Sequence, residues 1–162
     1  MFELERISPS YKKLGFFSFL FGAIEMSDPQ HSMFDKKYDE CTNNEDWNSA
    51  LNVLKEAIEV NPRSPYFHSC LGFLYKIVQD NEHAIIFFKE AIRLGGLLKY
   101  STITDNSYFA MGECFFALNN YDAALSCFQE VLKRSDAHMR KNRANNFTRE
   151  IIRRQPTKFR EI

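Results

Sequence analysis

A short motif recurs along this chain at a nearly fixed interval, and that regularity constrains the fold more than any other feature. Two copies, beginning at Leu54 and Phe88, share the run Lys-Glu-Ala-Ile. A looser copy begins at Leu20, so that the first three copies are equally spaced, and a fourth begins at Phe128 after a slightly longer interval. A period of about 34 residues indicates a structural unit that stacks on copies of itself. The chain is therefore expected to be a linear array of similar units.

The residue spacing inside each copy predicts that the units are made of α-helices. Apolar residues recur at intervals of three and four, which is the stripe of a helix that buries one side. One turn upstream of three copies stands an alanine, at positions 50, 84 and 124. Gly72 and Gly112 each lie at the same distance before the phenylalanine of their copy, Phe88 or Phe128. Glycine inside a helix costs about 1 kcal/mol relative to alanine, so its recurrence predicts close helix–helix contact at both positions.

The composition and the positions of the helix-breaking residues support helices packed on helices. The chain of 162 residues contains 16 phenylalanines but only 6 glycines and 5 prolines, too few breakers for a protein of strands and turns. Short polar segments at residues 79–82 and 119–122 separate the two helices expected in a unit. Pro62 ends the second helix of the first complete unit, because proline cannot continue a helix.

These features resemble the tetratricopeptide repeat, a helix–turn–helix unit of about 34 residues. In two units the residues that match its pattern are Leu71, Gly72, Tyr75, Ala84, Phe88 and Ala91, and then Met111, Gly112, Phe115, Ala124 and Phe128. The preceding unit matches in its second helix alone, through Ala50, Leu54, Ala57 and Pro62. Its first helix departs from the pattern, with Lys37 and Tyr38 where Leu-Gly is expected, and the pattern's tryptophan is absent from all three units. The resemblance implies an all-α fold, an antiparallel helix-pair superhelix or α-solenoid.

The expected organisation has a helical segment at each end of the repeats. It consists of a degenerate half-repeat over residues 1–30, three repeats over residues 31–136 (31–64, 65–98 and 105–136), and a basic capping helix with a tail over residues 137–162. Capping is expected because the terminal units of a stack cannot bury their apolar sides alone. The extra residues near 97–104 either extend the following helix or form a loop.

An apolar run at residues 14–24 follows Lys12 and Lys13, and three interpretations of it are open. Its eleven residues are too few to span a membrane as a helix, which needs about 20. The favoured interpretation is a buried helix over residues 16–25 that covers the first end of the stack. The alternatives are a helix that touches a membrane surface and a secretory signal peptide, although no clean cleavage site follows the run.

The resemblance also implies a binding site. In this family the first helix of each pair lines a concave groove, and the positions expected to face it are Asp35, Lys36, Asp39 and Thr42, then Tyr66, Ser69, Phe73, Lys76 and Ile77, then Asn106, Phe109, Glu113 and Phe116. Such a groove has one acidic end and an apolar middle, which suits an extended or helical peptide. The alternative is that Phe73, Phe109 and Phe116 are packed by the N-terminal or C-terminal segment of the chain itself.

One class of partner is disfavoured by the same positions. Heat-shock co-chaperones of this family hold a partner's C-terminal carboxylate with a clamp of lysine, asparagine and arginine. The matching positions here carry Asp35, Asp39, Cys70, Asn106 and Ala110. The clamp is absent, and the two aspartates would repel a carboxylate.

The charge of the chain is zero only as the sum of two opposite parts. From Lys133 onward there are 10 basic and 3 acidic residues, a net charge of +7, and the preceding part carries −7. The candidate docking bases are Arg140, Lys141, Arg143, Arg149, Arg153 and Arg154. They fit a solvated capping helix, docking to an acidic partner or anionic lipid, or attraction to the acidic body of a second copy in a homodimer. Nucleic acid is not expected as a partner, because Phe147 and Phe159 are too few for a stacking platform.

The remaining residues point away from catalysis. The four cysteines form no metal-binding or redox motif, and buried free thiols suit a reducing, cytoplasmic location. No catalytic motif is present, and each of the four histidines is isolated from suitable partners. We therefore expect a non-enzymatic protein-binding module without a cofactor or metal, acting as an adaptor or assembly factor. The alternatives are a small chaperone for unfolded clients, similar in architecture to type III secretion translocator chaperones, and a membrane-associated scaffold.

Overall fold

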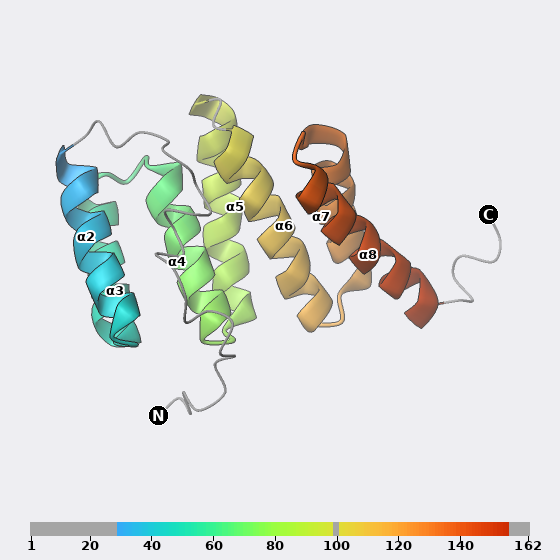
Figure 1. The fold of residues 1–162 in the computed structure, drawn as a ribbon, viewed down its shortest axis with the longest axis horizontal. Coiled ribbons are helices and arrows are strands. Elements are labelled where there is room, and N and C mark those ends of the chain that lie inside the picture. The colour runs from blue at the N-terminus through green and yellow to red at the C-terminus, as the bar shows by residue number, and fades with distance from the viewer. Residues whose placement is uncertain (1–28, 99–100, 156–162) are drawn as a thin grey trace.

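A computed structural model describes residues 29–98 and 101–155. Within these ranges the chain forms seven α-helices and no strands, which confirms the predicted all-α fold. The helices are α2 (Pro29–Asn43), α3 (Trp47–Val60), α4 (Pro65–Ile77), α5 (Asn81–Leu98), α6 (Ser101–Ala117), α7 (Tyr121–Arg134) and α8 (His138–Arg154). They stand in a row in chain order, from α2 at one end to α8 at the other (Figure 1). Most of the expected half-repeat, including residues 16–25, lies outside the described residues.

The three turns inside the helix pairs share one backbone conformation. Glu45, Gln79 and Asn119 have φ angles of 57°, 63° and 59°, which is the left-handed region that non-glycine residues rarely adopt. In each turn the amide of the next residue donates to the carbonyl five residues upstream, at 2.9 Å. The repeat seen in the sequence is thus also a repeat of turn geometry, with the same longer interval before its last copy.

The residue after each left-handed position caps the second helix of the pair. Asp46, Asp80 and Asn120 accept a hydrogen bond from the backbone amide three residues ahead, with N···O distances of 3.1, 3.2 and 3.3 Å. Such a cap satisfies one of the amides that a helix leaves unpaired at its start and is worth about 1 kcal/mol. Asp46, Asp80 and Asn120 therefore fix where α3, α5 and α7 begin.

The recurrent glycines lie where the two helices of a pair are closest. A Cβ atom on Gly72 would come within 2.7 Å of the Phe88 ring, and one on Gly112 would come within 2.8 Å of the Phe128 ring. Both phenylalanine side chains are fully buried. The predicted close contact is confirmed at both positions, and there is no room for even a methyl group unless a ring moves.

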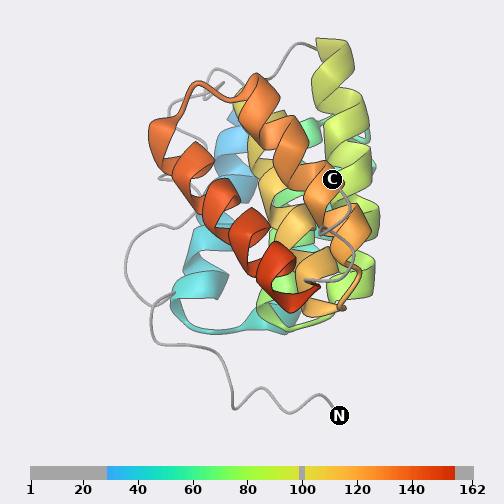
Figure 2. The same cartoon turned by 90° about the vertical axis from the view of Figure 1, so that its right-hand side faces the viewer.

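Two clusters of buried side chains form the core. The larger one runs from α2 to α7 through residues such as Phe34, Leu54, Phe67 and Leu71. The smaller one joins α6 and α7 to α8 and includes Phe128, with Ile151 from the last helix. Figure 2 shows the stack from its C-terminal end, with α8 lying across it. The extra residues expected near 97–104 mostly extend helices, because α5 continues to Leu98 and α6 starts at Ser101.

Candidate functional site

The first helix of each pair and the last helix lie next to one another on one side of the stack. The rings of Phe34 on α2 and Phe67 on α4 pack edge to face, with centroids 5.9 Å apart. The hydroxyls of Ser69 on α4 and Ser107 on α6 share a buried hydrogen bond of 3.0 Å. The rings of Phe109 on α6 and Phe147 on α8 continue this row, with centroids 6.0 Å apart. We call the side formed by α2, α4, α6 and α8 the inner face.

The α2 end of the inner face is acidic and aromatic. Asp35 and Asp39 are one helical turn apart and therefore lie on the same side of α2. Partial burial and the nearby Asp35 carboxylate raise the pKa of Asp39. Burial also raises the pKa of the Tyr66 hydroxyl on α4, and the Cys70 thiol and Asp35 carboxylate add to this effect. The carboxylates of Asp35 and Asp39 on α2 therefore lie near Tyr66 on α4. A cation bound there would reduce the repulsion between the two carboxylates.

The α4 part of the inner face is more buried than a freely exposed groove. Ser69 has no exposed surface, and Phe73 is 7% exposed with its ring edge packed against Phe88 at 5.0 Å. Tyr66 and Ile77 are half-buried. Lys76 makes a 2.9 Å ion pair with Glu113 of α6. This part of the face is tied to the core and to α6, and its partly accessible side chains are Tyr66, Lys76 and Ile77.

Helix α8 covers the aromatic residues that α6 places on the inner face. The Phe147 ring lies 6.0 Å from Phe109 and 5.2 Å from Phe116, edge on in both cases, and it stacks on Phe128 at 5.0 Å. The Arg143 guanidinium lies 4.4 Å from the centre of the Phe109 ring. Phe109 and Phe116 are therefore packed by the chain's own last helix and are not open groove surface.

Comparison with known proteins identifies the repeats. A family model described as "TPR repeat" matches residues 39–76, and one described as "Tetratricopeptide repeat" matches residues 106–138. The chain is a tetratricopeptide repeat protein. The fold is also similar to a solved structure, the N-terminal domain of stress-induced protein-1 (STI-1) from C. elegans. The TM-score is 0.65 at 14% sequence identity, over 75% of this chain and 98% of that one. A comparison with curated protein sequences gave no match.

Tetratricopeptide repeats generally mediate protein–protein interaction, so the inner face is the natural candidate site. The structure places the expected groove residues differently along it. Asp35 and Asp39 are partly buried near the α4 tyrosine, whereas Phe73, Asn106 and Phe109 are buried at 6–7% exposure. The expectation that Phe73 and Phe109 are exposed is therefore corrected, because they pack on the second-helix phenylalanines. For Phe109 and Phe116, the covering segment is the C-terminal helix.

The positions of the absent carboxylate clamp are also unsuited to holding an anion. Cys70 and Ala110 are 1% exposed and lie in the core. Asn106 is 6% exposed. Together with the two aspartates of α2, these described positions contain no lysine or arginine that could take the place of the clamp.

The bases of α8 are largely committed to contacts within this tetratricopeptide repeat protein. Arg143 makes a 2.8 Å ion pair with Glu113, the same carboxylate that Lys76 holds. Arg140 lies 3.8 Å from the buried Asp105 carboxylate and donates to Ser135 at 2.6 Å. Asp105 was not among the residues expected from the sequence to face the groove. Its spacing of eight residues from Glu113 puts both carboxylates on one side of α6, which was a usable signal.

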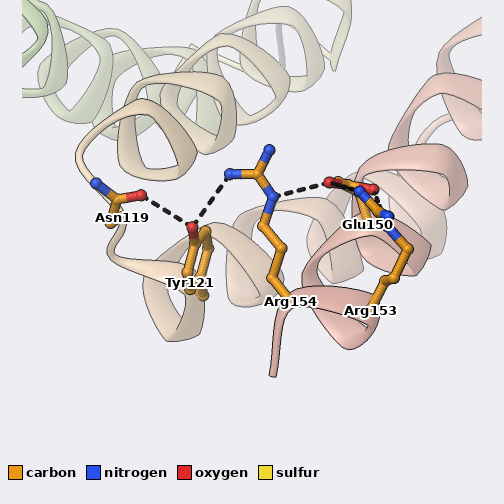
Figure 3. A network of polar contacts seen from close by, with 5 residues as sticks. All are labelled: Asn119, Tyr121, Glu150, Arg153 and Arg154. Atoms are coloured by element: carbon orange, nitrogen blue, oxygen red, sulfur yellow. Dashed lines mark hydrogen bonds and ion pairs between the residues drawn. The ribbon is translucent and has the colours of Figure 1, made fainter. Parts of the chain in front are cut away.

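The end of α8 is anchored by a polar network (Figure 3). The Arg154 guanidinium donates to Glu150 at 2.8 Å and to the Tyr121 hydroxyl at 3.2 Å, and that hydroxyl donates to Asn119 at 2.9 Å. Arg153 donates two hydrogen bonds to the same Glu150 carboxylate, at 2.9 and 3.0 Å. Arg153 and Arg154, two of the expected docking residues, therefore make contacts within the protein at the end of α8. Lys141 is partly exposed and Arg149 is exposed, so they remain candidates for docking.

Three of the four cysteines, Cys70, Cys114 and Cys127, are buried. All four cysteines are free, and burial raises the pKa of Cys114 to about 12 and that of Cys127 to about 11. Within residues 29–98 and 101–155, no three histidine, cysteine or carboxylate side chains gather closely enough to hold a metal ion. None of the helices in those ranges has the length and apolar character needed to cross a membrane.

Proposed function

We propose that the chain is a non-enzymatic adaptor or assembly factor whose inner face binds a segment of another protein. The observation that carries the proposal is the α2 end of that face, where Asp35 and Asp39 lie on one side of a helix beside Tyr66. This part of the face combines negative charge with partly accessible aromatic surface. The repeats indicate a protein-binding role. The two aspartates and Tyr66 indicate which kind of segment this part of the face would bind.

The expected partner segment carries lysine or arginine beside apolar residues. A basic side chain placed near Asp39 would favour its ionised form, which burial and Asp35 now disfavour. The ring of Tyr66 offers a surface for the apolar part of the segment and for cation–π contact. A partner with an acidic segment is disfavoured by the same two carboxylates.

Affinity capture from the native host tests this proposal. The full chain and an Asp39→Lys variant serve as baits, and the matched control is Glu56→Lys, which makes the same charge change at an exposed position of α3. We expect the wild type and Glu56→Lys to retain a common partner and Asp39→Lys to lose it. Equal retention of the partner by all three baits would show that the partner does not bind the α2 end of the inner face, and it would contradict the proposal.

Substituting the buried aromatics is a poorer test of binding. Phe73→Asp or Phe109→Asp places a charge against the fully buried Phe88 or Phe128. Burial of an unpaired charge disrupts packing, so loss of the helical circular dichroism signal is the expected result. The acidic residues of α2 allow the face to be changed without that effect.

A further inference from the structure

Two arginines of α8 lie over aromatic rings of α6. The Arg143 guanidinium is 4.4 Å from the centre of the Phe109 ring, and the Arg154 guanidinium is 4.7 Å from the centre of the Phe116 ring. The two arginine side chains are nevertheless 60% and 44% exposed. A guanidinium that is already held over a ring loses less conformational freedom when it binds a ligand. Both arginines are therefore positioned in advance and accessible.

Each of these two arginines shares its carboxylate with a second cation. Glu113 pairs with the first arginine at 2.8 Å and with Lys76 at 2.9 Å. Glu150 pairs with the second arginine at 2.8 Å and with Arg153 at 2.9 Å. One negative charge therefore faces two positive charges at both places, and a net positive charge is left at each.

Both arginines also have N–H groups left for a further acceptor. A guanidinium carries five such groups. Among the described residues, Arg143 donates a hydrogen bond only through Nη2, to Glu113. Arg154 donates through Nε and Nη1, and its third nitrogen carries no dashed line in Figure 3. An added carboxylate could therefore bind either arginine without displacing its present partner.

The spacing of Arg143 and Arg154 defines what could bind both. They are eleven residues apart, close to three helical turns, so they lie on the same side of α8 about 16 Å apart. An extended chain advances about 3.3 Å per residue, so about five residues of it cover this distance. Met139, one turn before Arg143, is 77% exposed and offers apolar surface beside the first arginine.

We propose that the seam between α6 and α8 binds an acidic segment of a partner protein, with one carboxylate on Arg143 and another on Arg154. The charge of the helix is complementary to such a segment, because α8 carries six basic residues and one acidic residue. The inference goes beyond the proposed function and does not depend on the α2 end. The aspartates of α2 lie at the other end of the row (Figure 1), and salt screens exposed charges beyond about 10 Å.

The other bases of α8 fit a specific acidic partner less well. Lys141 and Arg149 make no ion pair within the described part of the chain. Their spacing from Arg143 and Arg154 places them on other sides of the helix, away from the seam. A flat anionic membrane would meet those outer sides first. The two seam arginines instead face the side of the stack to which α6 belongs, which favours a narrow chain as the ligand.

A peptide titration tests the seam. The probe is a fluorescein-labelled peptide of glycine and serine with one leucine and two glutamates five positions apart, titrated with the full chain at low salt and followed by fluorescence anisotropy. We expect saturable binding that weakens about tenfold in Arg143→Gln with Arg154→Gln. The matched control, Lys141→Gln with Arg149→Gln, removes the same charge from the same helix and should change little. Equal weakening in both variants would mean that only net charge attracts the peptide, and it would overturn the proposal.

A predicted gain of binding guards against effects on folding. Glu113→Gln removes the carboxylate that competes for Arg143 and keeps the size of the side chain. We expect the peptide to bind this variant severalfold more tightly than the wild type, a result that a loosened α8 would not produce. Weaker or unchanged binding by Glu113→Gln overturns the inference.

Two further measurements separate other occupants. Binding of the full chain to vesicles of phosphatidylserine and phosphatidylcholine, without binding to the peptide, would make this a lipid surface. Self-association in sedimentation that is lost in Arg143→Gln with Arg154→Gln would make the occupant a second copy. Either result overturns the proposal. Asp39→Lys should leave peptide binding unchanged, and affinity capture tests the α2 end separately, so each proposal can fail without the other.

Discussion

The first helix pair differs from the second and third at the point where the two helices of a pair approach each other. The later pairs each set a glycine of the first helix against a phenylalanine ring of the second. At the equivalent positions, α2 has Tyr38 and α3 has Leu54, both buried. The large residue has moved to the first helix and a smaller one stands on the second. The interior requires a filled volume rather than particular residues, so the repeat pattern can fail in sequence while the pair persists.

The largest expected effect comes from breaking this division of volume. Gly72→Val places a branched side chain where even a Cβ would lie 2.7 Å from the Phe88 ring. We expect a loss of about 3 kcal/mol in the free energy of unfolding, measured by urea denaturation followed by circular dichroism. The matched control is Gly96→Val on α5, where an added Cβ meets no atom within 4 Å.

The control should be neutral or slightly stabilising, because valine is a better helix former than glycine. Combining Gly72→Val with Phe88→Leu makes the second pair resemble the first in its division of volume. The double variant should be more stable than the sum of the single changes predicts, by about 1 kcal/mol or more. Strict additivity would show that the two positions do not share one space.

A smaller effect is expected from the ring that only the third pair receives from α8. Phe147→Ala removes a half-buried ring that stacks on Phe128 at 5.0 Å. We expect a loss of about 2 kcal/mol, because the ring is partly exposed. Hydrogen exchange should show faster exchange in α8 while the amides of α2 and α3 are unchanged. Uniform loss of protection throughout the stack would contradict an end-specific role.

Ion pairs that join separate helices should contribute more to stability than ion pairs inside one helix. Glu113→Gln removes the carboxylate that joins α4 and α8 through Lys76 and Arg143. We expect a loss of about 1 kcal/mol at low salt that shrinks as salt is added. Glu90→Gln, which removes an exposed pair with Arg93 inside α5, is the matched control and should cost less. Equal losses would mean that bridging separate helices adds nothing.

The smallest effect concerns pH and the end of α8. Hydrogen bonds from Arg153 and Arg154 lower the pKa of Glu150 from 4.5 to about 2. A lowered pKa in the folded state means that the contribution to stability is present above pH 4.5 and is lost as the pH falls toward 2. Carboxyl carbon NMR titration measures this directly, and Arg153→Gln should move the midpoint upward. A midpoint near 4.5 in the wild type would show that the network does not form in solution.

Much of the fold was predictable because it depends on local signals. The repeat period, the glycines and the polar caps each act within one helix pair, so the sequence displays them directly. The first helix of the first pair was harder, since Tyr38 on α2 compensates for Leu54 on α3 and follows no family pattern. The extra residues near 97–104 gave no preference between loop and helix until α6 was seen to begin at Ser101.

The candidate site was less predictable because it depends on how separate helices meet. Phe109 and Phe116 are spaced correctly for the inner face, but whether they stay open is decided by Phe147, two helices further along the chain. The bases of α8 gave a net charge without revealing that Arg143 and Arg140 face carboxylates on α6. Sequence spacing finds the side of a helix, whereas the rotation of the covering helix is set by packing.

The stability of the stack can be raised at the three left-handed turn residues. Glu45, Gln79 and Asn119 are exposed, and each holds a conformation that costs an L-residue about 1 kcal/mol. Glycine would relieve that strain at each turn without touching the core or the inner face, with the least gain at asparagine, which tolerates the conformation best. Glycine substitutions at these three turns should therefore stabilise the protein as an engineering scaffold without changing any residue of the inner face.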